Sequence, residues 1–306
     1  MAKRDLEKAG EGQILEVSRR FVTLVTEGGR VVTGKLSSKS LDFVVGDNVS
    51  FESRDGELFV TEGTPALRCL RRTFHGSLKR MGANIDLLCV IAACGATWNT
   101  AAIDRMLVAG AAQDIPSVLV LNKVDLGLDE LAPQLAVYEE AGVSVVRCSA
   151  KRGDGIERVR QLLDQDGVRV MALCGVSGVG KSSILNTLIP DARSRTGEVS
   201  DRTGQGKQTT SQPRGYLYQR VKQAQKIVID LPGVQYFGLS HLEPLAVSRA
   251  FSEIASAASG CRFRDCKHTK ERDCAVRAGV ESGAIAEWRY ESYLRILEEI
   301  DNAREY

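Results

Sequence analysis

The first part of the chain carries the alternating pattern of short β-strands. Apolar and polar residues alternate, or β-branched residues cluster, in segments separated by turn residues such as Glu27-Gly28-Gly29 and Asp55-Gly56. The segments are 13–17, 21–25, 30–34, 48–51 and 57–60. So many short strands in so little chain predict a small closed barrel, for which the OB-fold is the commonest candidate. Another small barrel, such as an SH3-like one, is the alternative.

From residue 85 the hydrophobic pattern changes. Apolar runs typical of buried strands now alternate with amphipathic, helix-like stretches at 101–112 and 131–141. The apolar runs are 85–91, 116–121, 143–147, 168–173 and 226–229. This alternation predicts an α/β domain in which a parallel sheet is covered by helices on both faces.

After Ser240 the chain becomes polar and helical. Residues 284–304 have a long charged helical pattern, whose expected buried stripe is Trp288, Leu294, Leu297 and Ile300. The 306 residues therefore divide into a multi-domain chain. We predict a β-barrel domain at 1–66, an α/β domain at 67–240 and a helical domain at 241–306.

Composition excludes several classes of protein. Apolar residues make up 43% and charged residues 26%, as is ordinary for a globular chain. The longest apolar run, residues 87–94, is too short to span a membrane, so we expect no membrane partner. The charged first dozen residues lack the apolar core of a secretory signal, which predicts a cytoplasmic protein.

Basic residues gather in two places although the net charge is only +2. One cluster lies between residues 193 and 226. The other is made of Arg68, Arg71, Arg72, Lys79 and Arg80. Such clusters can bind nucleic acid, or they can be solvated loops, and charge alone does not decide between the two.

A P-loop motif lies where an apolar strand ends and a helical stretch begins, as the motif requires. Its glycines allow backbone N–H groups to surround phosphates, and the helix N-terminus adds positive potential. Lys181 would contact the β- and γ-phosphates, and the Ser182 hydroxyl would hold Mg²⁺. The nucleotide-contacting residues are Gly175, Val176, Ser177, Gly178, Val179, Gly180, Lys181, Ser182 and Ser183.

Two further motifs indicate that the base is guanine. Asn122-Lys123-Val124-Asp125 ends a strand, where Asp125 can accept from the N1–H and N2–H₂ groups of guanine. Asn122 would tie neighbouring loops together, and the stem of Lys123 would cover the base. Ser149-Ala150-Lys151 follows the next strand, and the Ala150 N–H would meet the guanine O6. Each motif alone could be an ordinary strand-end turn, but together they predict guanine-nucleotide binding.

Switch-like segments complete the expected phosphate site. Asp230-Leu231-Pro232-Gly233 follows a strand, so that Asp230 would contact Mg²⁺ through water and the Gly233 N–H would meet the γ-phosphate. Thr209 or Thr210, in the segment 206–210, could complete the Mg²⁺ shell. In ordinary GTPases the P-loop comes first. Here the guanine motifs precede it, which predicts a circularly permuted GTPase domain.

A metal-binding pattern follows near the C-terminus. The spacing C-x4-C-x-H-x5-C brings three thiolates and one imidazole together, which matches a tetrahedral structural Zn²⁺ site with no open position. The predicted ligands of one Zn²⁺ per chain are Cys261, Cys266, His268 and Cys274. Unpaired surface cysteines are the alternative.

The permuted motifs, the barrel before them and the Cys/His pattern after them resemble the family of ribosome-small-subunit-dependent GTPases (RsgA, also called YjeQ). The resemblance extends from about Gln13 to Cys274. It implies an OB-fold, a permuted GTPase domain and a zinc domain. It also implies GTP hydrolysis stimulated by the 30S subunit, late in 30S maturation, with binding near the decoding region of 16S rRNA. We further expect a monomer.

The hydrolytic residue is the point at which the chain departs from that family. The family's switch usually reads G-x-H-T-T-T, with a histidine proposed to assist hydrolysis, whereas this chain has Gln208 there and Ser211 at the third Thr position. Val234 stands where Ras-like proteins carry a catalytic Gln, and Val cannot orient water. The candidate catalytic residues are Lys181, Gln208 and Thr209.

Other functions remain open at this point. A GTP-dependent RNA-binding placement switch with negligible hydrolysis would need the same nucleotide motifs. A P-loop metabolic kinase would need an acceptor-binding lid, and it would need neither N-K-x-D nor a zinc module.

Overall fold

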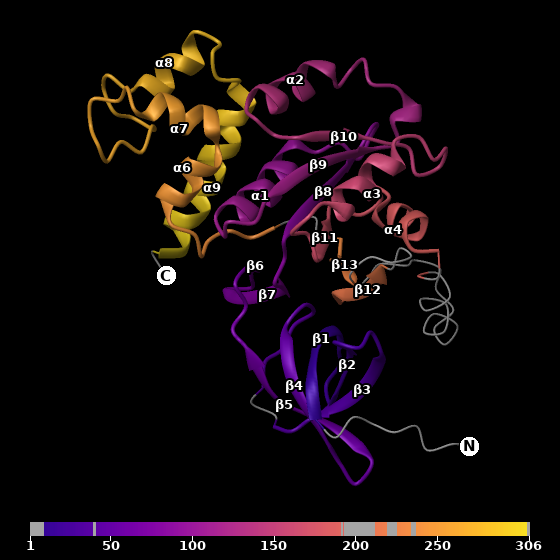
Figure 1. Ribbon diagram of the computed structural model, residues 1–306. Coiled ribbons are helices and arrows are strands. Elements are labelled where there is room, and N and C mark those ends of the chain that lie inside the picture. The colour runs from indigo at the N-terminus through magenta and orange to yellow at the C-terminus, as the bar shows by residue number, and fades with distance from the viewer. Residues whose placement is uncertain are drawn as a thin grey trace.

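The computed structural model describes residues 9–38, 41–190, 192, 212–218, 225–233 and 237–304. Figure 1 shows a barrel at one end, a sheet with helices in the middle, and a helical module beside the sheet. In that view the barrel lies at the bottom and the helical module at the upper left. No helix in the described part of the chain combines the length and the apolar character that crossing a bilayer requires.

The N-terminal barrel confirms the predicted OB-fold. Its strands are β1 (Ala9–Val17), β2 (Phe21–Thr26), β3 (Val31–Leu36), β4 (Asn48–Arg54) and β5 (Glu57–Thr64). They close in the order β1-β2-β3-β5-β4, with β3 and β5 parallel and the other pairs antiparallel. The interior is filled by Ile14, Val22, Leu24, Val49, Phe51, Leu58 and Val60. This order excludes the SH3-like alternative.

A β-hairpin that the sequence pattern did not reveal joins the barrel to the sheet. Its strands are β6 (Cys69–Phe74) and β7 (Ser77–Ala83). They carry four residues of the basic cluster at 68–80, namely Arg71, Arg72, Lys79 and Arg80, and Arg68 lies just before β6. Arg80 of this cluster is held by the barrel, because its guanidinium lies 2.5 Å from the buried carboxylate of Asp47. Its pKa is raised by the bonds to Cys69 and Asp47, which outweigh the lowering by desolvation. Arg71 and Lys79 are exposed.

The central sheet follows the α/β prediction. Its strands are β8 (Leu87–Ala93), β9 (Ser117–Asn122), β10 (Val145–Arg147), β11 (Val170–Cys174), β12 (Arg214–Tyr218) and β13 (Lys226–Asp230). The order is β10-β9-β8-β11-β13-β12. The pairs are parallel except at the edge, where β12 runs antiparallel to β13. The sequence pattern predicted β13 but not β12.

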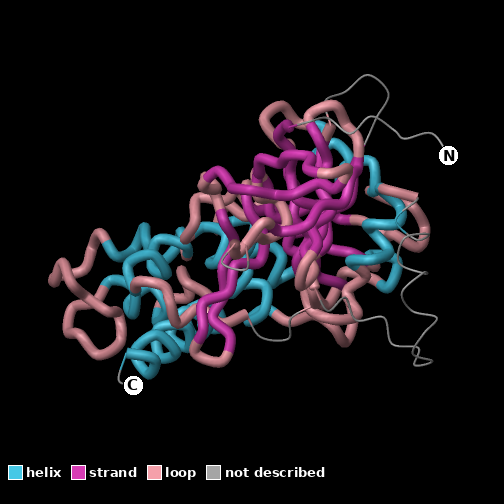
Figure 2. Tube along the Cα trace, turned by 90° about the horizontal axis from the view of Figure 1, so that it is seen from below, coloured by secondary structure: helices cyan, strands magenta, loops and turns pink. Residues whose placement is uncertain are grey.

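Helices cover both faces of the sheet, as predicted. On one face lie α1 (Thr100–Ala111) and α2 (Ala132–Glu140); on the other lie α3 (Ile156–Asp164) and α4 (Lys181–Leu188). Figure 2, seen from below, shows helices on both sides of the strands. Both faces are apolar because β8, β11 and β13 are buried along their whole length, which is typical of strands inside a parallel sheet.

The C-terminal module is helical. It contains α6 (Pro244–Ala250), α7 (Ser252–Ala258), α8 (Ala275–Glu281) and α9 (Glu287–Arg304). The predicted stripe of α9 is only partly right, since Leu297 and Ile300 are buried but Trp288 and Leu294 are half-buried. The buried face of α9 is Arg289, Ser292, Tyr293, Ile296, Leu297 and Ile300. Arg289 and Ser292 can be buried on this face because Arg289 pairs with Asp104 and Glu253, and Ser292 hydrogen-bonds to Asp104.

A buried ionic network fixes this module to the sheet domain. Arg289 of α9 lies 2.5 Å from Asp104 of α1 and 2.6 Å from Glu253 of α7. The Tyr138 hydroxyl of α2 donates to the same Asp104 carboxylate at 2.8 Å. Asp104 is fully buried, so removal of Arg289 would leave an unpaired buried charge. The network therefore sets how the C-terminal module lies on α1 and α2.

Candidate functional site

The P-loop residues form a turn between β11 and α4. Gly178 and Gly180 have φ angles of 85° and 96°, a region that favours glycine. A Cβ atom on Gly180 would also lie 2.3 Å from the side-chain nitrogen of Asn122. The loop therefore needs glycine for its backbone conformation and for its close approach to the end of β9.

Lys181 is the first residue of α4 and is 9% exposed. Its Nζ donates to the Gly175 carbonyl at 2.9 Å, inside the turn. Burial lowers the pKa of Lys181, and the charge of Asp230 opposes this shift. A Cβ atom on Gly233 would lie 3.1 Å from the Lys181 Nζ, so the loop after β13 packs against the P-loop lysine.

Asn122 joins the other loops to the P-loop. Its side-chain Nδ2 donates to the Val179 carbonyl at 2.9 Å, and its Oδ1 accepts from the Ala150 N–H at 3.0 Å. Lys123 has a left-handed backbone with φ of 60°, and its Nζ donates to the Gly178 carbonyl at 2.7 Å. Residues from three strand ends are thereby brought together, as the sequence predicted.

Asp125 is held by Ser149. The Ser149 hydroxyl donates to Oδ1 of Asp125 at 2.6 Å, and the Arg152 N–H donates to the same hydroxyl at 3.2 Å. The bond from Ser149 lowers the pKa of Asp125, so the carboxylate is ionised at neutral pH. An ionised carboxylate accepts hydrogen bonds only, which suits a ring edge that carries two donors.

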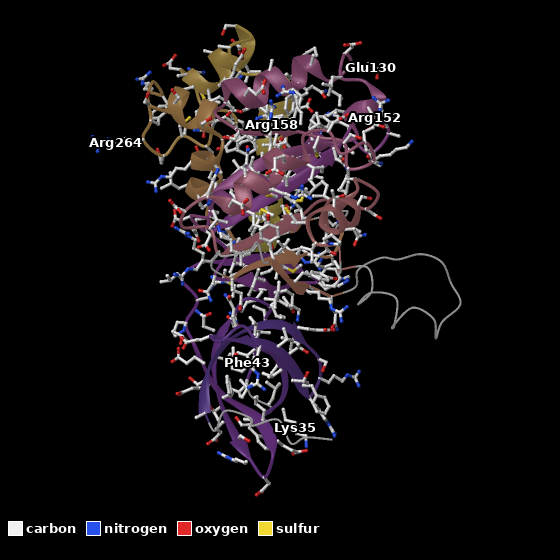
Figure 3. All side chains as sticks on the ribbon, turned by 45° about the vertical axis from the view of Figure 1, so that its right-hand side comes forward. Lys35, Phe43, Glu130, Arg152, Arg158 and Arg264 are labelled. Atoms are coloured by element: carbon white, nitrogen blue, oxygen red, sulfur yellow. The ribbon has the colours of Figure 1, made fainter. Side chains whose placement is uncertain are left out.

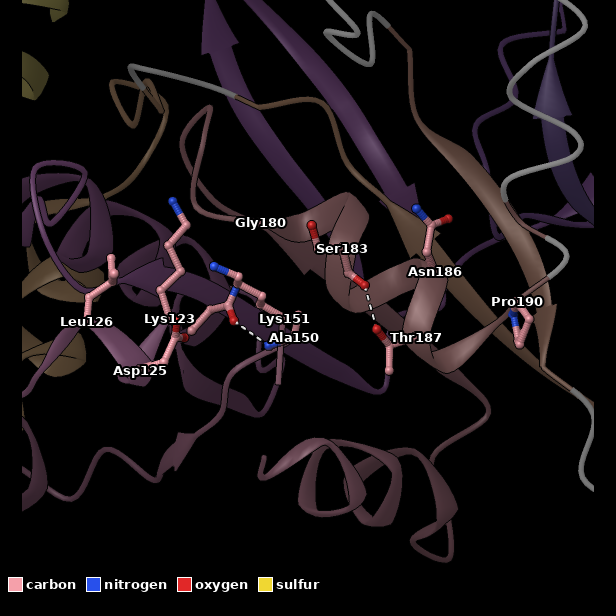
Figure 4. Close-up of a pocket in the computed structure, with 11 residues that line it drawn as sticks. Lys123, Asp125, Leu126, Ala150, Lys151, Gly180, Ser183, Asn186, Thr187 and Pro190 are labelled. Carbon is pink, nitrogen blue, oxygen red and sulfur yellow. Dashed lines mark hydrogen bonds between the residues drawn. The ribbon is translucent and has the colours of Figure 1, made fainter. Parts of the chain in front are cut away.

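A cavity of about 660 Å³ lies between these motifs and α4, as Figure 4 shows. It is lined by Asn122, Lys123, Asp125, Leu126, Ala150, Lys151, Gly180, Ser183, Asn186, Thr187 and Pro190. The size is that of a small-ligand site. The sequence did not single out Leu126, Asn186, Thr187 or Pro190, which belong to no motif and are identified only by their position at the rim.

The residues predicted to contact the phosphates and Mg²⁺ lie partly within the described part of the chain. Asp230 ends β13 at 3% exposure beside β11, and Ser182 and Ser183 are exposed in the first turn of α4. Gln208, Thr209 and Thr210 lie outside the described residues, and so do Ser211 and Val234.

The four predicted metal ligands come together in the C-terminal module, between α7 and the start of α8. Their donor atoms all lie within 4.8 Å of one another. The Sγ atoms of Cys261 and Cys274 are 3.9 Å apart, and each is 3.5 Å from the Nδ1 atom of His268. A tetrahedral Zn²⁺ site has S–S edges of about 3.8 Å and S–N edges of about 3.6 Å, from its usual bond lengths. The donor set and spacing therefore fit zinc, with Nδ1 of His268 as the ligand.

Glu271 supports the loop that carries these ligands. Its carboxylate accepts from the backbone N–H groups of Lys267, Thr269 and Lys270 at 2.8 to 2.9 Å. These bonds hold the pKa of Glu271 at about 2 even though desolvation opposes them. The Tyr290 hydroxyl of α9 also donates to the His268 carbonyl at 2.5 Å. The sequence reasoning missed both residues, because no motif marks a carboxylate that binds backbone.

Comparison with known proteins places the chain in a family. The family model described as RsgA GTPase matches residues 65–240. A protein of Actinobacillus pleuropneumoniae named small ribosomal subunit biogenesis GTPase RsgA is 35% identical, over 98% of this chain and 88% of its own length. The chain belongs to the RsgA GTPase family. An RsgA of Shewanella oneidensis is 34% identical over 96% of this chain and 84% of its own length.

Solved structures of this family have the same fold. The crystal structure of YjeQ from Thermotoga maritima superposes with a TM-score of 0.72 at 28% identity, covering 95% of this chain and 98% of that one. YloQ, described as a circularly permuted GTPase, superposes with a TM-score of 0.69 at 23% identity and 96% coverage of both chains. The permutation inferred from motif order is confirmed, and RsgA membership makes the chain a GTPase.

Proposed function

We propose that this GTPase acts in biogenesis of the small ribosomal subunit. On this proposal it binds 16S rRNA late in 30S maturation and hydrolyses GTP to GDP and phosphate under stimulation by the 30S subunit. The relatives carry small-subunit biogenesis in their names. The observation that carries the nucleotide assignment is the single cavity that joins the Asp125 carboxylate to the first turns of the P-loop helix.

Guanine would lie in that cavity, between Asp125 and the Ala150 N–H. Asp125 would accept from the two donors on the guanine edge, and the hydrogen bond from Ser149 orients its carboxylate for this task. Lys123 would cover the ring with its stem, and Lys151 lines the same cavity. Adenine would leave the Asp125 carboxylate unpaired, which supports selection of GTP and GDP.

The phosphates would follow the P-loop toward β13. The N–H groups of residues 175–183 would surround them, and Lys181 would leave the Gly175 carbonyl to contact the β- and γ-phosphates. Mg²⁺ supplies charge neutralisation between these phosphates when it is bound. Ser182 and Asp230 would hold it, with Thr209 or Thr210 of the segment outside the described residues. The Gly233 N–H would meet the γ-phosphate.

The zinc site is structural on this proposal. Four protein donors at tetrahedral spacing leave no position for a substrate, so Cys261, Cys266, His268 and Cys274 would stabilise the module rather than catalyse. We propose module boundaries at 1–66, 67–240 and 241–306, a cytoplasmic location and a monomeric chain.

Exposed basic residues support binding to rRNA. Around the zinc loop, Arg264, Lys270 and Arg272 are exposed and have no ion pair among the described residues, whereas Arg262 pairs with Asp273. Figure 3 shows Arg264 at the outer edge of the C-terminal module. Exposed cations of this kind can neutralise phosphates of a nucleic acid.

Single-turnover hydrolysis of GTP, with and without 30S subunits, tests the function. We expect 30S subunits to raise the rate, and co-sedimentation with 30S but not 50S subunits in the presence of a non-hydrolysable GTP analogue. Equal rates with and without 30S, together with 30S binding, would instead indicate a placement switch. Lys181→Ala serves as the control that removes the phosphate counter-charge.

A further inference from the structure

The chain that leaves the nucleotide site after Gly233 is fastened a few residues later to the C-terminal helix. Leu239 and Ser240 donate their backbone N–H groups to Oε1 of Glu299, at 2.7 and 3.1 Å. Glu299 belongs to α9, so a carboxylate of the C-terminal module fixes the path of the chain out of the GTPase sheet.

Arg105 of α1 completes the attachment. Its Nη1 lies 2.5 Å from Oε2 of Glu299 and donates to the Phe237 carbonyl at 3.0 Å. The side chain of Arg105 is 10% exposed and that of Glu299 is 16% exposed, so the pair is largely shielded from water. This one ion pair thus makes hydrogen bonds to residues 237, 239 and 240.

The attachment lies close enough to the nucleotide site to constrain it. Gly233 and Phe237 are four residues apart, so their Cα atoms are separated by at most about 14 Å, the length of four extended residues. Gly233 itself is packed against Lys181 and the Ser177 N–H. The fastened residues 237–240 are therefore close in the chain to the glycine that would contact the γ-phosphate.

A second contact holds the same segment from the hairpin. The Thr73 N–H donates to the Gly238 carbonyl at 2.8 Å, and a Cβ atom on Gly238 would lie 2.3 Å from the Thr73 carbonyl. The segment is thus held on one side by the backbone of β6 and on the other by Arg105 and Glu299. The contacts of Arg105 and Glu299 are made by side chains, so they can be removed by substitution.

We propose that Glu299 and Arg105 are positioning residues for GTP hydrolysis. They hold residues 237–240 so that Gly233 stays in register with the P-loop while the γ-phosphate is transferred to water. This inference rests on the proposed assignment of Gly233 to the γ-phosphate. The alternative is a purely structural role, in which the ion pair only packs α9 against α1.

The test compares Glu299→Ala with Glu298→Ala, which changes the exposed neighbour on the same helix. We measure kcat and KM for GTP with 30S subunits, the affinity for a fluorescent GDP, zinc content and co-sedimentation with 30S. A misplacement of about 1 Å can cost about a hundredfold in rate, so we expect kcat to fall about tenfold or more in Glu299→Ala. KM, GDP affinity, zinc content and 30S binding should match those of Glu298→Ala.

Glu299→Gln separates the hydrogen bonds from the charge. Glutamine keeps an oxygen that can accept from Leu239 and Ser240 but places no charge against Arg105. Its kcat should lie between those of wild type and Glu299→Ala. The inference is overturned if Glu299→Ala turns over like Glu298→Ala, if kcat falls only in proportion to lost zinc or lost 30S binding, or if Gln and Ala variants are equal.

Lys181→Ala distinguishes a failure of this inference from a failure of the nucleotide assignment. Normal turnover in Lys181→Ala would mean that the P-loop is not the hydrolytic site. Lost turnover in Lys181→Ala with normal turnover in Glu299→Ala would reject the positioning role alone.

Discussion

Asn122, the last residue of β9, donates a 2.9 Å hydrogen bond to the carbonyl of Val179 in the P-loop. The two residues are 57 positions apart in the chain. Because Asn122 also accepts from the Ala150 N–H, one buried amide holds the proposed base site and the proposed phosphate site in a fixed relation. A side chain that lines the cavity thus also sets the distance between the proposed base and phosphate subsites.

Asn122→Ala should therefore damage the site chiefly by releasing the two loops that Asn122 holds together. Loss of this amide leaves the Val179 carbonyl and Ala150 N–H without their partner, which should cost about 1–3 kcal/mol of stability. We expect a lower melting temperature together with about tenfold weaker binding of both GTP and GDP, measured by fluorescent-nucleotide titration. Asn302→Ala, on the exposed end of α9, is the control and should change neither quantity.

Asp125→Asn tests base selection. The substitution replaces an acceptor by a donor where guanine presents its amine, so GTP affinity should fall about 10- to 100-fold. Xanthosine triphosphate, whose ring carries a carbonyl in place of the amine, should bind the variant better than the wild type. Asp129→Asn, at an exposed position nearby, should keep the preference for GTP. Unchanged GTP affinity in Asp125→Asn would contradict the assignment.

Zinc removal should affect the C-terminal module first. The purified chain is expected to hold one Zn²⁺ through Cys261, Cys266, His268 and Cys274, and a chelator should melt that module because metal binding and local folding are linked. GTP affinity should change little, while 30S co-sedimentation should weaken. Cys274→Ser should lose zinc, whereas Cys69→Ser, in the β6–β7 hairpin, should retain it. Absence of zinc from protein purified without chelators would refute this.

Glu271→Gln should speed the loss of zinc. A neutral amide binds the three backbone N–H groups less well than a carboxylate does, and weakening the support of a metal site costs about 10- to 100-fold in affinity. The pKa of Glu271 is about 2, below its ordinary 4.5, so its stabilising effect is complete above pH 4.5 and is lost as the pH falls toward 2.

The difference between Glu271→Gln and wild type should therefore stay constant from pH 8 to pH 6, measured as the rate of zinc transfer to a chromophoric chelator. Glu281→Gln, on the exposed end of α8, should behave like the wild type. A difference that changes across this pH range would rule out Glu271 as its source.

Gln208 can be tested although it lies outside the described residues. A neutral glutamine can orient an attacking water but cannot remove its proton near neutral pH. If orientation is what hydrolysis needs, Gln208→His should keep most of the 30S-stimulated rate and Gln208→Ala should lose most of it, with normal GTP binding in both. A wild-type rate in Gln208→Ala would show that another side chain, or an rRNA group, orients the attacking water.

Much of the site followed from the sequence because its residues sit at strand ends. Asn122 ends β9, Asp230 ends β13, and the P-loop follows β11, so parallel strands bring their motifs to one edge of the sheet whatever their order in the chain. The four clustered Cys and His residues could be found because short spacings and a fixed donor chemistry limit the possibilities.

Other features depended on partners that hydrophobicity does not reveal. The β6–β7 hairpin carries basic residues where a strand pattern would need apolar ones, so its strands were missed. The helical period predicted for α9 was right, but its buried face is rotated from the predicted one. The reason is that Arg289 and Ser292 are buried against Asp104 and its neighbours. Polar residues of this kind enter a core only through a specific partner, and that partner is far away in the chain.

The strand order of the sheet also determines at what point of translation the proposed nucleotide site can assemble. β8 pairs with β9 on one side and with β11 on the other, where Leu87 meets Met171. A ribosome that makes this chain releases the strands of the proposed base site first, while one edge of β8 still lacks its neighbour. The β13 end of the phosphate site emerges later still. On the proposed assignment, GTP can therefore stabilise only a chain whose β13 has emerged, and the early half of the sheet must persist without that ligand.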